Sequence, residues 1–252
     1  MNKPIYRYLA DRKWREYQHK IIVQRINQLG IVPDVLPIFE PTADVRLAFR
    51  SRKVQPGEFV DSRVSEVPPR LNVQVFDKGE RLVTIVVIDS DVPVVDKDNF
   101  VTRCHFLATN IPVNPRETSL PLSQVSDAQI VQKWLSPFAQ KGSPYHRYSV
   151  FVLQQEPGRT YDSVEMKKKI EPKATSSFSM RWFVESFQMK PIGISIFRST
   201  WDEGTAGVME RAGIEGADIE FKRKKVIALK PKQKKRGWEA RHASDKYKSL
   251  RR

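Results

Sequence analysis

Apolar residues near the start of the chain recur every three or four positions, with Arg and Lys between them. This spacing predicts one α-helix from Tyr6 to Leu29, ended by Gly30. Its apolar stripe has seven members: Tyr6, Leu9, Trp14, Tyr17, Ile21, Ile22 and Ile26. Such a stripe must be covered, so we expect the helix to pack on the core or to dock on a partner. We also expect the rest of the chain to fold without residues 1–28.

Beyond Pro41 the pattern changes to that of β-strands. Apolar and polar residues alternate in the first two predicted strands, whereas the third is apolar on both faces and predicts a central, fully covered strand. Six strands are predicted, at residues 45–50, 71–76, 83–88, 105–109, 148–153 and 193–197. Helical spacing returns at Phe178–Met189 and Thr205–Ala212. The pattern therefore predicts a mainly β domain with a few helices.

The charge is concentrated at the two ends of this chain of 252 residues, whose formal net charge is +15. Residues 221–252 have 14 Lys and Arg against two acids, a net charge of +12. Residues 1–28 have a net charge of +5, and residues 29–220 have −2. This distribution is typical of a folded module with basic arms, and it favours an anionic partner, most commonly nucleic acid.

The C-terminal segment combines cations with aromatic side chains and few aliphatic ones, so we expect it to be extended until it binds. Lys and Arg neutralise phosphates, and an aromatic ring stacks on bases. The residues expected to contact RNA are Lys222, Arg223, Lys224, Lys225, Lys230, Lys232, Lys234, Lys235, Arg236, Trp238 and Arg241. No apolar run approaches the ~20 residues of a membrane-spanning helix, so we expect no membrane association. The single cysteine, Cys104, excludes an intramolecular disulfide.

Four segments with polar residues lie at or near the predicted strands: Asp89–Pro93, Cys104–Phe106, Gly142–Tyr148 and Ser195–Asp202. In this order and spacing they resemble the phosphatidylethanolamine-binding-protein family, whose D-P-D-x-P, H-H-F-type and G-x-x-H-R-Y segments converge on a small anion pocket. The resemblance implies a Greek-key β-sandwich with peripheral helices. It also implies three parts, namely an N-terminal helical arm and linker (1–39), the β-domain (40–212) and a basic C-terminal extension (213–252).

The resemblance further implies the members of the pocket, with a cis peptide bond before the proline. They are Asp89, Asp91, Pro93, His105, His146 and Tyr148. The surrounding positions differ from the family pattern, since Arg103 stands in place of an aromatic wall residue and Met209 in place of a tyrosine. A ligand site and a buried, mutually satisfied network both fit these residues, and we favour the structural network.

The polar residues do not favour catalysis, a metal or a cofactor. No nucleophile stands beside a base in a recognisable spacing, and His105 and His146 lack a short-spaced partner ligand. With its basic arms, the chain resembles most the fungal-type members of the family found in the mitochondrial large ribosomal subunit. This implies a non-enzymatic structural constituent of the central protuberance, in the mitochondrial matrix. It would contact ribosomal RNA and other mitochondrial ribosomal proteins, and it would not be a homo-oligomer. The alternative is a free head-group-binding or signalling-inhibitor protein of the same fold.

Overall fold

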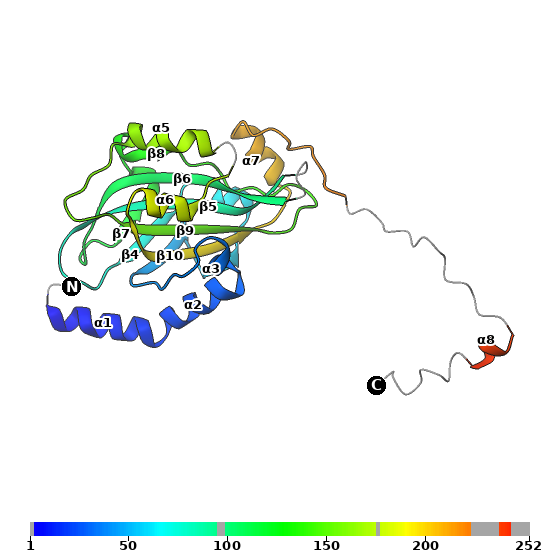
Figure 1. Ribbon diagram of the computed structural model, residues 1–252, viewed down its shortest axis with the longest axis horizontal. Coiled ribbons are helices and arrows are strands. Elements are labelled where there is room, and N and C mark those ends of the chain that lie inside the picture. The colour runs from blue at the N-terminus through cyan, green and yellow to red at the C-terminus, as the bar shows by residue number, and fades with distance from the viewer. Residues whose placement is uncertain (1–2, 95–98, 175–176, 223–236, 243–252) are drawn as a thin grey trace. The chain divides into compact units, whose positions relative to one another are not determined.

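The computed structural model describes residues 3–94, 99–174, 177–222 and 237–242, and it is drawn in Figure 1. The contacts of the chain divide it into two units, Met1–Phe221 and Lys222–Arg252. The predicted boundaries lay after residues 39 and 212 instead. The N-terminal segment thus belongs to the same unit as the β-domain, and the site described below lies within that unit.

The larger sheet of the first unit has the strand order β3-β10-β9-β5-β6-β8. Its strands are β3 (Glu58–Phe59), β5 (Arg81–Val94), β6 (Asn99–Val113), β8 (Ile130–Gln132), β9 (His146–Gln154) and β10 (Lys190–Ser199). Strand β5 pairs antiparallel with both β6 and β9, and its residues 83–89 are all buried. The prediction of a central strand covered on both faces is therefore confirmed, although β5 continues well past the apolar run.

The smaller sheet has the order β2-β1-β4-β7. Its strands are β1 (Asp44–Phe49), β2 (Arg52–Val54), β4 (Arg70–Gln74) and β7 (Ser119–Pro121). The inward side chains of β1 and β4, such as Leu47 and Leu71, share one buried core with Ile85 and Val150 of the larger sheet. Burial of alternate residues on one side of each strand explains the period-two pattern. The two packed sheets confirm the predicted β-sandwich.

Helices cover the other face of the larger sheet. A second buried core joins Val86 and Ile88 of β5 to α2 (Gln18–Gln28), α3 (Ile31–Asp34), α5 (Ser163–Ala174) and α6 (Met180–Ser186). Helix α5 was not predicted. Helix α6 is shorter than the predicted helix at 178–189, because Gln188 adopts a positive φ of 52°. The remaining helices are α4 (Ser62–Ser65), α7 (Thr205–Arg211), α8 (Trp238–His242) and the 3-10 turns η2 (Leu122–Gln124) and η3 (Asp127–Gln129).

The predicted N-terminal helix is two helices, α1 (Pro4–Glu16) and α2, because the backbone at Tyr17 leaves the helical region (φ −132°, ψ −67°). The break changes which residues of the stripe are covered. Trp14 and Ile26 are buried, whereas Leu9 and Tyr17 are exposed. Since Ile22 and Ile26 belong to the second core, the prediction that the domain closes its core without residues 1–28 is wrong.

Backbone hydrogen bonds join the residues just before β1 to the larger sheet. The backbone N–H groups of Thr42 and Ala43 both donate to the carbonyl oxygen of Ile192 in β10, at 2.7 and 2.9 Å. A β-bulge follows at Gly193, where an added Cβ would lie only 2.4 Å from Cγ2 of Val45. Only glycine fits at position 193, and this contact between β1 and β10 is called the crossing below. Among the described residues, no helix is both long and apolar enough to cross a membrane.

Candidate functional site

Three neighbouring strands bring four of the predicted pocket residues together. Asp89 ends the buried part of β5, His105 lies on β6, and His146 and Tyr148 lie on β9. Asp89 is paired directly with Tyr148 in the ladder between β5 and β9. All four side chains are buried. The cluster formed by these four residues is called the polar site below.

The carboxylate of Asp89 is the centre of the polar site. His146 Nδ1 donates to Asp89 Oδ2 at 2.8 Å, and His105 Nε2 lies 3.9 Å from the same oxygen. The remaining polar groups bind the loop that follows β8. His105 Nδ1 donates to the Leu135 carbonyl at 2.9 Å, while the Tyr148 hydroxyl donates to the Phe138 carbonyl at 2.7 Å. The site therefore binds this loop to three neighbouring strands.

The protonation of His105 follows from its surroundings. Burial lowers the pKa of His105 to about 4, although the neighbouring Asp89 opposes this shift. The ring is thus neutral at neutral pH, and its single proton is on Nδ1, which faces the Leu135 carbonyl. Nε2 is then an acceptor, and it makes no hydrogen bond to any described residue. Burial, followed by the charge of Asp89, raises the pKa of Tyr148 well above its usual value, which keeps the phenol neutral.

We expect the stability of the domain to rise with pH between about 4 and 6.5 through His105. In this window the unfolded chain protonates this residue while the folded chain does not, so unfolding takes up a proton. As the pH falls, a pKa shift of this size lowers the free energy of unfolding by about 3 kcal/mol in total, and the loss is complete below the folded-state pKa. Urea unfolding at several pH values measures it. His105→Asn keeps an N–H donor for Leu135 and should flatten the slope, so equal slopes in the two proteins would contradict the assignment.

Two predicted pocket residues lie elsewhere. The Asp91 carboxylate accepts from Arg147 Nη2 at 2.7 Å and from Arg147 Nε at 2.8 Å. The same guanidinium donates to the Leu29 carbonyl at 2.6 Å and to Asp34 at 3.0 Å. Arg147 therefore ties β9 to the N-terminal segment, and the Asp91 side chain faces Arg147 and not the polar site, to which Asp91 contributes only its backbone N–H, a donor to Asp89 Oδ1 at 2.9 Å.

Pro93 continues β5, where it is paired with Phe100 of β6. In the described part of the chain the cis peptide bond is Val32–Pro33, so the bond expected to be cis before Pro93 is trans. An extended, paired strand accounts for this difference, since residues on both sides of Pro93 keep their partners in the ladder.

Residues outside the predicted pocket set complete the surroundings of the polar site. The guanidinium of Arg103 lies 5.5 Å from the ring centre of Phe138, and its charge contributes to the low pKa of His105. The Ser143 hydroxyl donates to the Gln140 carbonyl at 2.7 Å and lies 3.4 Å from His146 Nε2. An unpartnered acceptor beside a guanidinium is suited to a small ligand that carries both a donor and a negative charge.

The predicted RNA-contacting residues lie in the second unit or at its start. Lys222, Trp238 and Arg241 are exposed, with Trp238 at 74%. The other members lie outside the described residues: Arg223, Lys224, Lys225, Lys230, Lys232, Lys234, Lys235 and Arg236. Within the described ranges, no group of three or more His, Cys, Asp or Glu residues is placed to hold a metal ion.

Comparison with known proteins identifies a matching family and related proteins. The family model described as phosphatidylethanolamine-binding protein matches residues 50–190. The large ribosomal subunit protein mL38 of Schizosaccharomyces pombe is 24% identical over 212 residues, which is 82% of this chain. The match spans 66% of that relative, so about a third of it has no counterpart here.

Solved structures agree on the fold. Carboxypeptidase Y inhibitor, in its complex with the cognate proteinase, matches with a TM-score of 0.57 at 18% identity, over 73% of this chain and 97% of the inhibitor. The phosphatidylethanolamine-binding protein of Plasmodium vivax matches with a TM-score of 0.53 at 16% identity, over 71% of this chain and 97% of its own. At these identities the likeness concerns the arrangement of the two sheets.

Proposed function

This chain belongs to the phosphatidylethanolamine-binding-protein family, and from that premise we propose that it is a structural constituent of the mitochondrial large ribosomal subunit. The observation that carries the proposal is the extent of the similarity to mL38. The family model covers residues 50–190, but the similarity to mL38 covers 82% of the chain and so reaches beyond that segment. The strongly basic C-terminal segment supports the same conclusion, because ribosomal RNA is a polyanion.

In this proposal the three parts of the chain have separate roles. The β-sandwich is a rigid body in the central protuberance without catalytic duty, and the polar site holds three of its strands and the loop after β8 together. The basic C-terminal segment lies along ribosomal RNA. Helix α1 contacts a neighbouring ribosomal protein, since its apolar residues Ile5, Tyr8 and Leu9 are at least half exposed. The protein then acts in the mitochondrial matrix, where this subunit functions.

We expect the tagged full-length protein to sediment with the large ribosomal subunit when a mitochondrial lysate is separated on a sucrose gradient. Depletion of the protein should lower the yield of complete large subunits. A ribosomal constituent is held by many contacts, so washing in moderate salt should not release it. Sedimentation of the whole pool as a small free protein would contradict the proposal.

One observation favours a second function, the binding of a small anion or phospholipid head group. His105 Nε2 is buried, has no hydrogen-bond partner among the described residues and lies 3.9 Å from Asp89. A head group that donates a hydrogen bond would satisfy it. Thermal unfolding with phosphoethanolamine separates the two functions, because a rise in melting temperature equivalent to micromolar affinity requires an open ligand site.

A further inference from the structure

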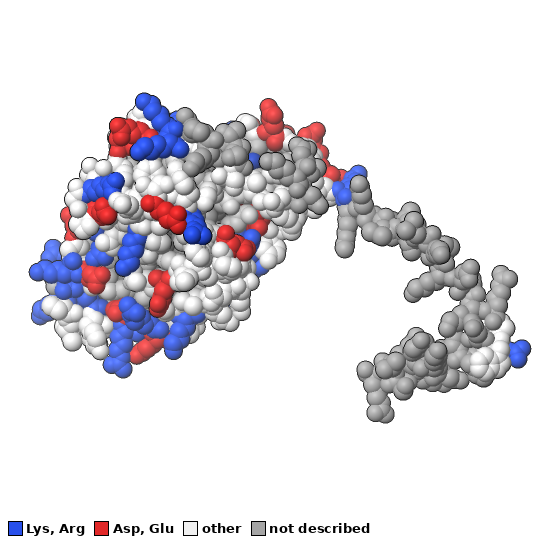
Figure 2. Space-filling model, viewed as in Figure 1, with Lys and Arg blue, Asp and Glu red and all other residues white. Residues whose placement is uncertain are grey.

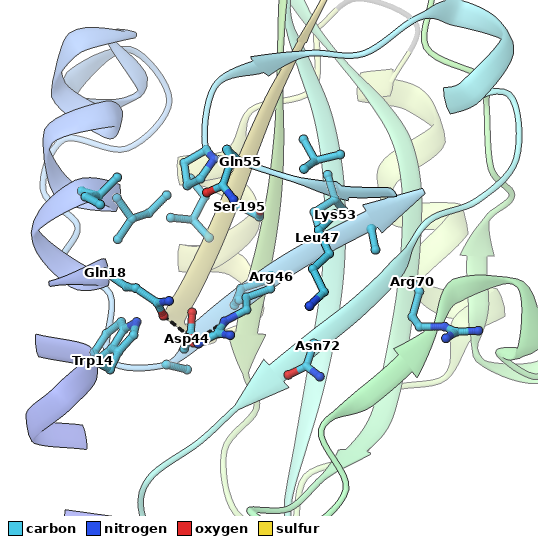
Figure 3. A pocket seen from close by; sticks show the side chains of 18 of the residues that line it. Trp14, Gln18, Asp44, Arg46, Leu47, Lys53, Gln55, Arg70, Asn72 and Ser195 are labelled. Atoms are coloured by element: carbon cyan, nitrogen blue, oxygen red, sulfur yellow. Dashed lines mark hydrogen bonds and ion pairs between the residues drawn. The ribbon is translucent and has the colours of Figure 1, made fainter. Parts of the chain in front are cut away.

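A groove of about 810 Å³ runs along the outer face of the smaller sheet, and Figure 3 shows it from close by. Strands β1, β2 and β4 form its floor, and α2 with the end of α1 forms one wall. Four cationic side chains line it: Arg46, Arg50, Lys53 and Arg70. All four are exposed. The carboxylate that lines the groove is Asp44.

The pairing of the strands sets the positions of these cations. Ala48 of β1 is the partner of both Lys53 in β2 and Arg70 in β4. Paired residues of antiparallel strands point to the same face, so the two cations flank a small side chain. Their Cα atoms are about 10 Å apart, because neighbouring strands are spaced by about 4.8 Å. Arg46 and Asn72 form the next row on the same face.

The charges on this face are not balanced within the domain. Arg46 forms an ion pair with Asp44 at 2.7 Å and donates to Gln18 Oε1 at 2.7 Å, as the dashed lines in Figure 3 mark. Neither Lys53 nor Arg70 forms an ion pair with a carboxylate in the described part of the chain. A bound anion would balance the charges of Lys53 and Arg70.

The wall of the groove supplies an aromatic surface beside the cations. Tyr17, at the break between α1 and α2, is 69% exposed and lines the groove together with Gln18. The Lys and Arg residues of the two helices do not line the groove, although Figure 2 shows blue side chains gathered over this part of the molecule. Rows of cations with an adjacent exposed ring are the features that bind single-stranded nucleic acids, through phosphates and stacked bases.

We propose that this groove binds a single-stranded segment of RNA. Lys53 and Arg70 neutralise phosphates, the amide of Asn72 adds a hydrogen bond, and a base stacks on Tyr17. An acidic peptide would use the cations and leave the ring without a role, so the aromatic wall favours RNA. The proposal rests on the groove's own charges and not on the similarity to mL38, and it stands or falls independently of the ribosomal role.

The test uses the full chain with eight of the 14 C-terminal cations neutralised, so that the C-terminal segment contributes less to the measured affinity. In this background Lys222, Arg223, Lys224, Lys225, Lys232, Lys234, Lys235 and Arg236 are replaced with glutamine. The groove variant adds Lys53→Gln and Arg70→Gln. The matched control adds Lys133→Gln and Lys168→Gln, which remove the same charge from exposed positions at β8 and α5. Fluorescence anisotropy with a short oligouridine reports affinity across a range of salt.

We expect the groove variant to bind about twenty-fold more weakly at ~0.1 M salt, because each lost phosphate contact releases about 0.7 fewer counterions. Its log affinity should fall with log salt less steeply, by about 1.4, while the control stays close to its parent. Tyr17→Ala should weaken binding without changing the salt dependence, and Tyr17→Phe should retain the affinity. Equal affinities of groove variant and control would overturn the proposal.

Two further outcomes would also overturn it. One is competition by polyglutamate as strong as by oligouridine, which indicates an acidic protein partner, and the other is a preference for duplex RNA. If the groove variant melts at a lower temperature than the control, ultraviolet crosslinking of oligouridine to the unmodified full chain decides. Crosslinks at Tyr17 or on the floor strands support the groove, and crosslinks confined to other parts of the chain refute it.

Discussion

Replacing eight of the 14 C-terminal cations with glutamine, as in the background described above, should lower the affinity of the full chain for RNA by two orders of magnitude or more. The log affinity falls with log salt by about 0.7 to 0.9 for each phosphate contacted, so the variant should show a much flatter dependence. The melting temperature of the first unit should barely change, because its own net charge is only +3 (+5 for residues 1–28 and −2 for residues 29–220). Fluorescence anisotropy across a salt series and differential scanning calorimetry measure the two quantities.

Trp238→Ala is the control that separates stacking from charge. It should weaken binding without altering the salt dependence, because a stacked ring releases no counterions. If the variant with eight substitutions kept its affinity and its salt dependence, the C-terminal segment would not be the RNA contact. The groove would then account for whatever RNA binding the protein has.

The second large effect concerns α2. Ile26 is 2% exposed within the core that α2 shares with the larger sheet, so Ile26→Ala should lower the free energy of unfolding by about 2 to 5 kcal/mol. Removal of residues 1–28 should leave a domain that is unfolded or aggregates, since it exposes that core. Urea unfolding monitored by circular dichroism measures the change.

The matched control lies on α1. Leu9 is 50% exposed, so Leu9→Ala should change the free energy of unfolding by less than about 0.5 kcal/mol. Similar losses in the two variants would show that α1 and α2 contribute equally. A folded domain without residues 1–28 would restore the original prediction from the sequence.

Much of the sandwich could be predicted because burial on one face leaves a trace in the sequence. Leu47 and Phe49 point inward while Arg46 points to water, and that alternation shows at 45–50. The short strands β2, β3 and β8 could not be found in this way. Two or three residues do not establish a period, and their pairing depends on the register of longer strands.

The helices were predicted less well, for physical reasons that differ. Among the residues of α5 whose side chains are described, only Met166 and Ile170 are buried. Its apolar stripe therefore has two members, and three consecutive lysines between them make it hard to recognise in the sequence. The break at Tyr17 has no Gly or Pro to indicate it. Because the sequence does not reveal the break, it could not show that Leu9 is exposed while Ile26 is buried.

The polar site was predicted from a resemblance, not from periodicity. Asp89, His105 and His146, which the motifs assign to one pocket, lie together in the structure, whereas Asp91, which the same D-P-D-x-P motif assigns to it, turns its side chain to Arg147. Its partner, Arg147, stands next to His146 on β9, and the alternation of a strand sends neighbouring side chains to opposite faces. The groove was missed since its cations come from three strands whose register the sequence does not display.

The crossing at Gly193 has a consequence for how the molecule can vary. Strand β1 carries the groove on its outer face, and it is fixed to β10 through Ile192 and through the close approach of Val45 to Gly193. Strand β10 pairs in turn with β9, which carries His146 and Tyr148. Charged residues on the outer surface of β1 can therefore be substituted one at a time, while the buried contacts with β10 fix the position of the strand. Related proteins could acquire different partners on this face without reshaping the sandwich beneath it.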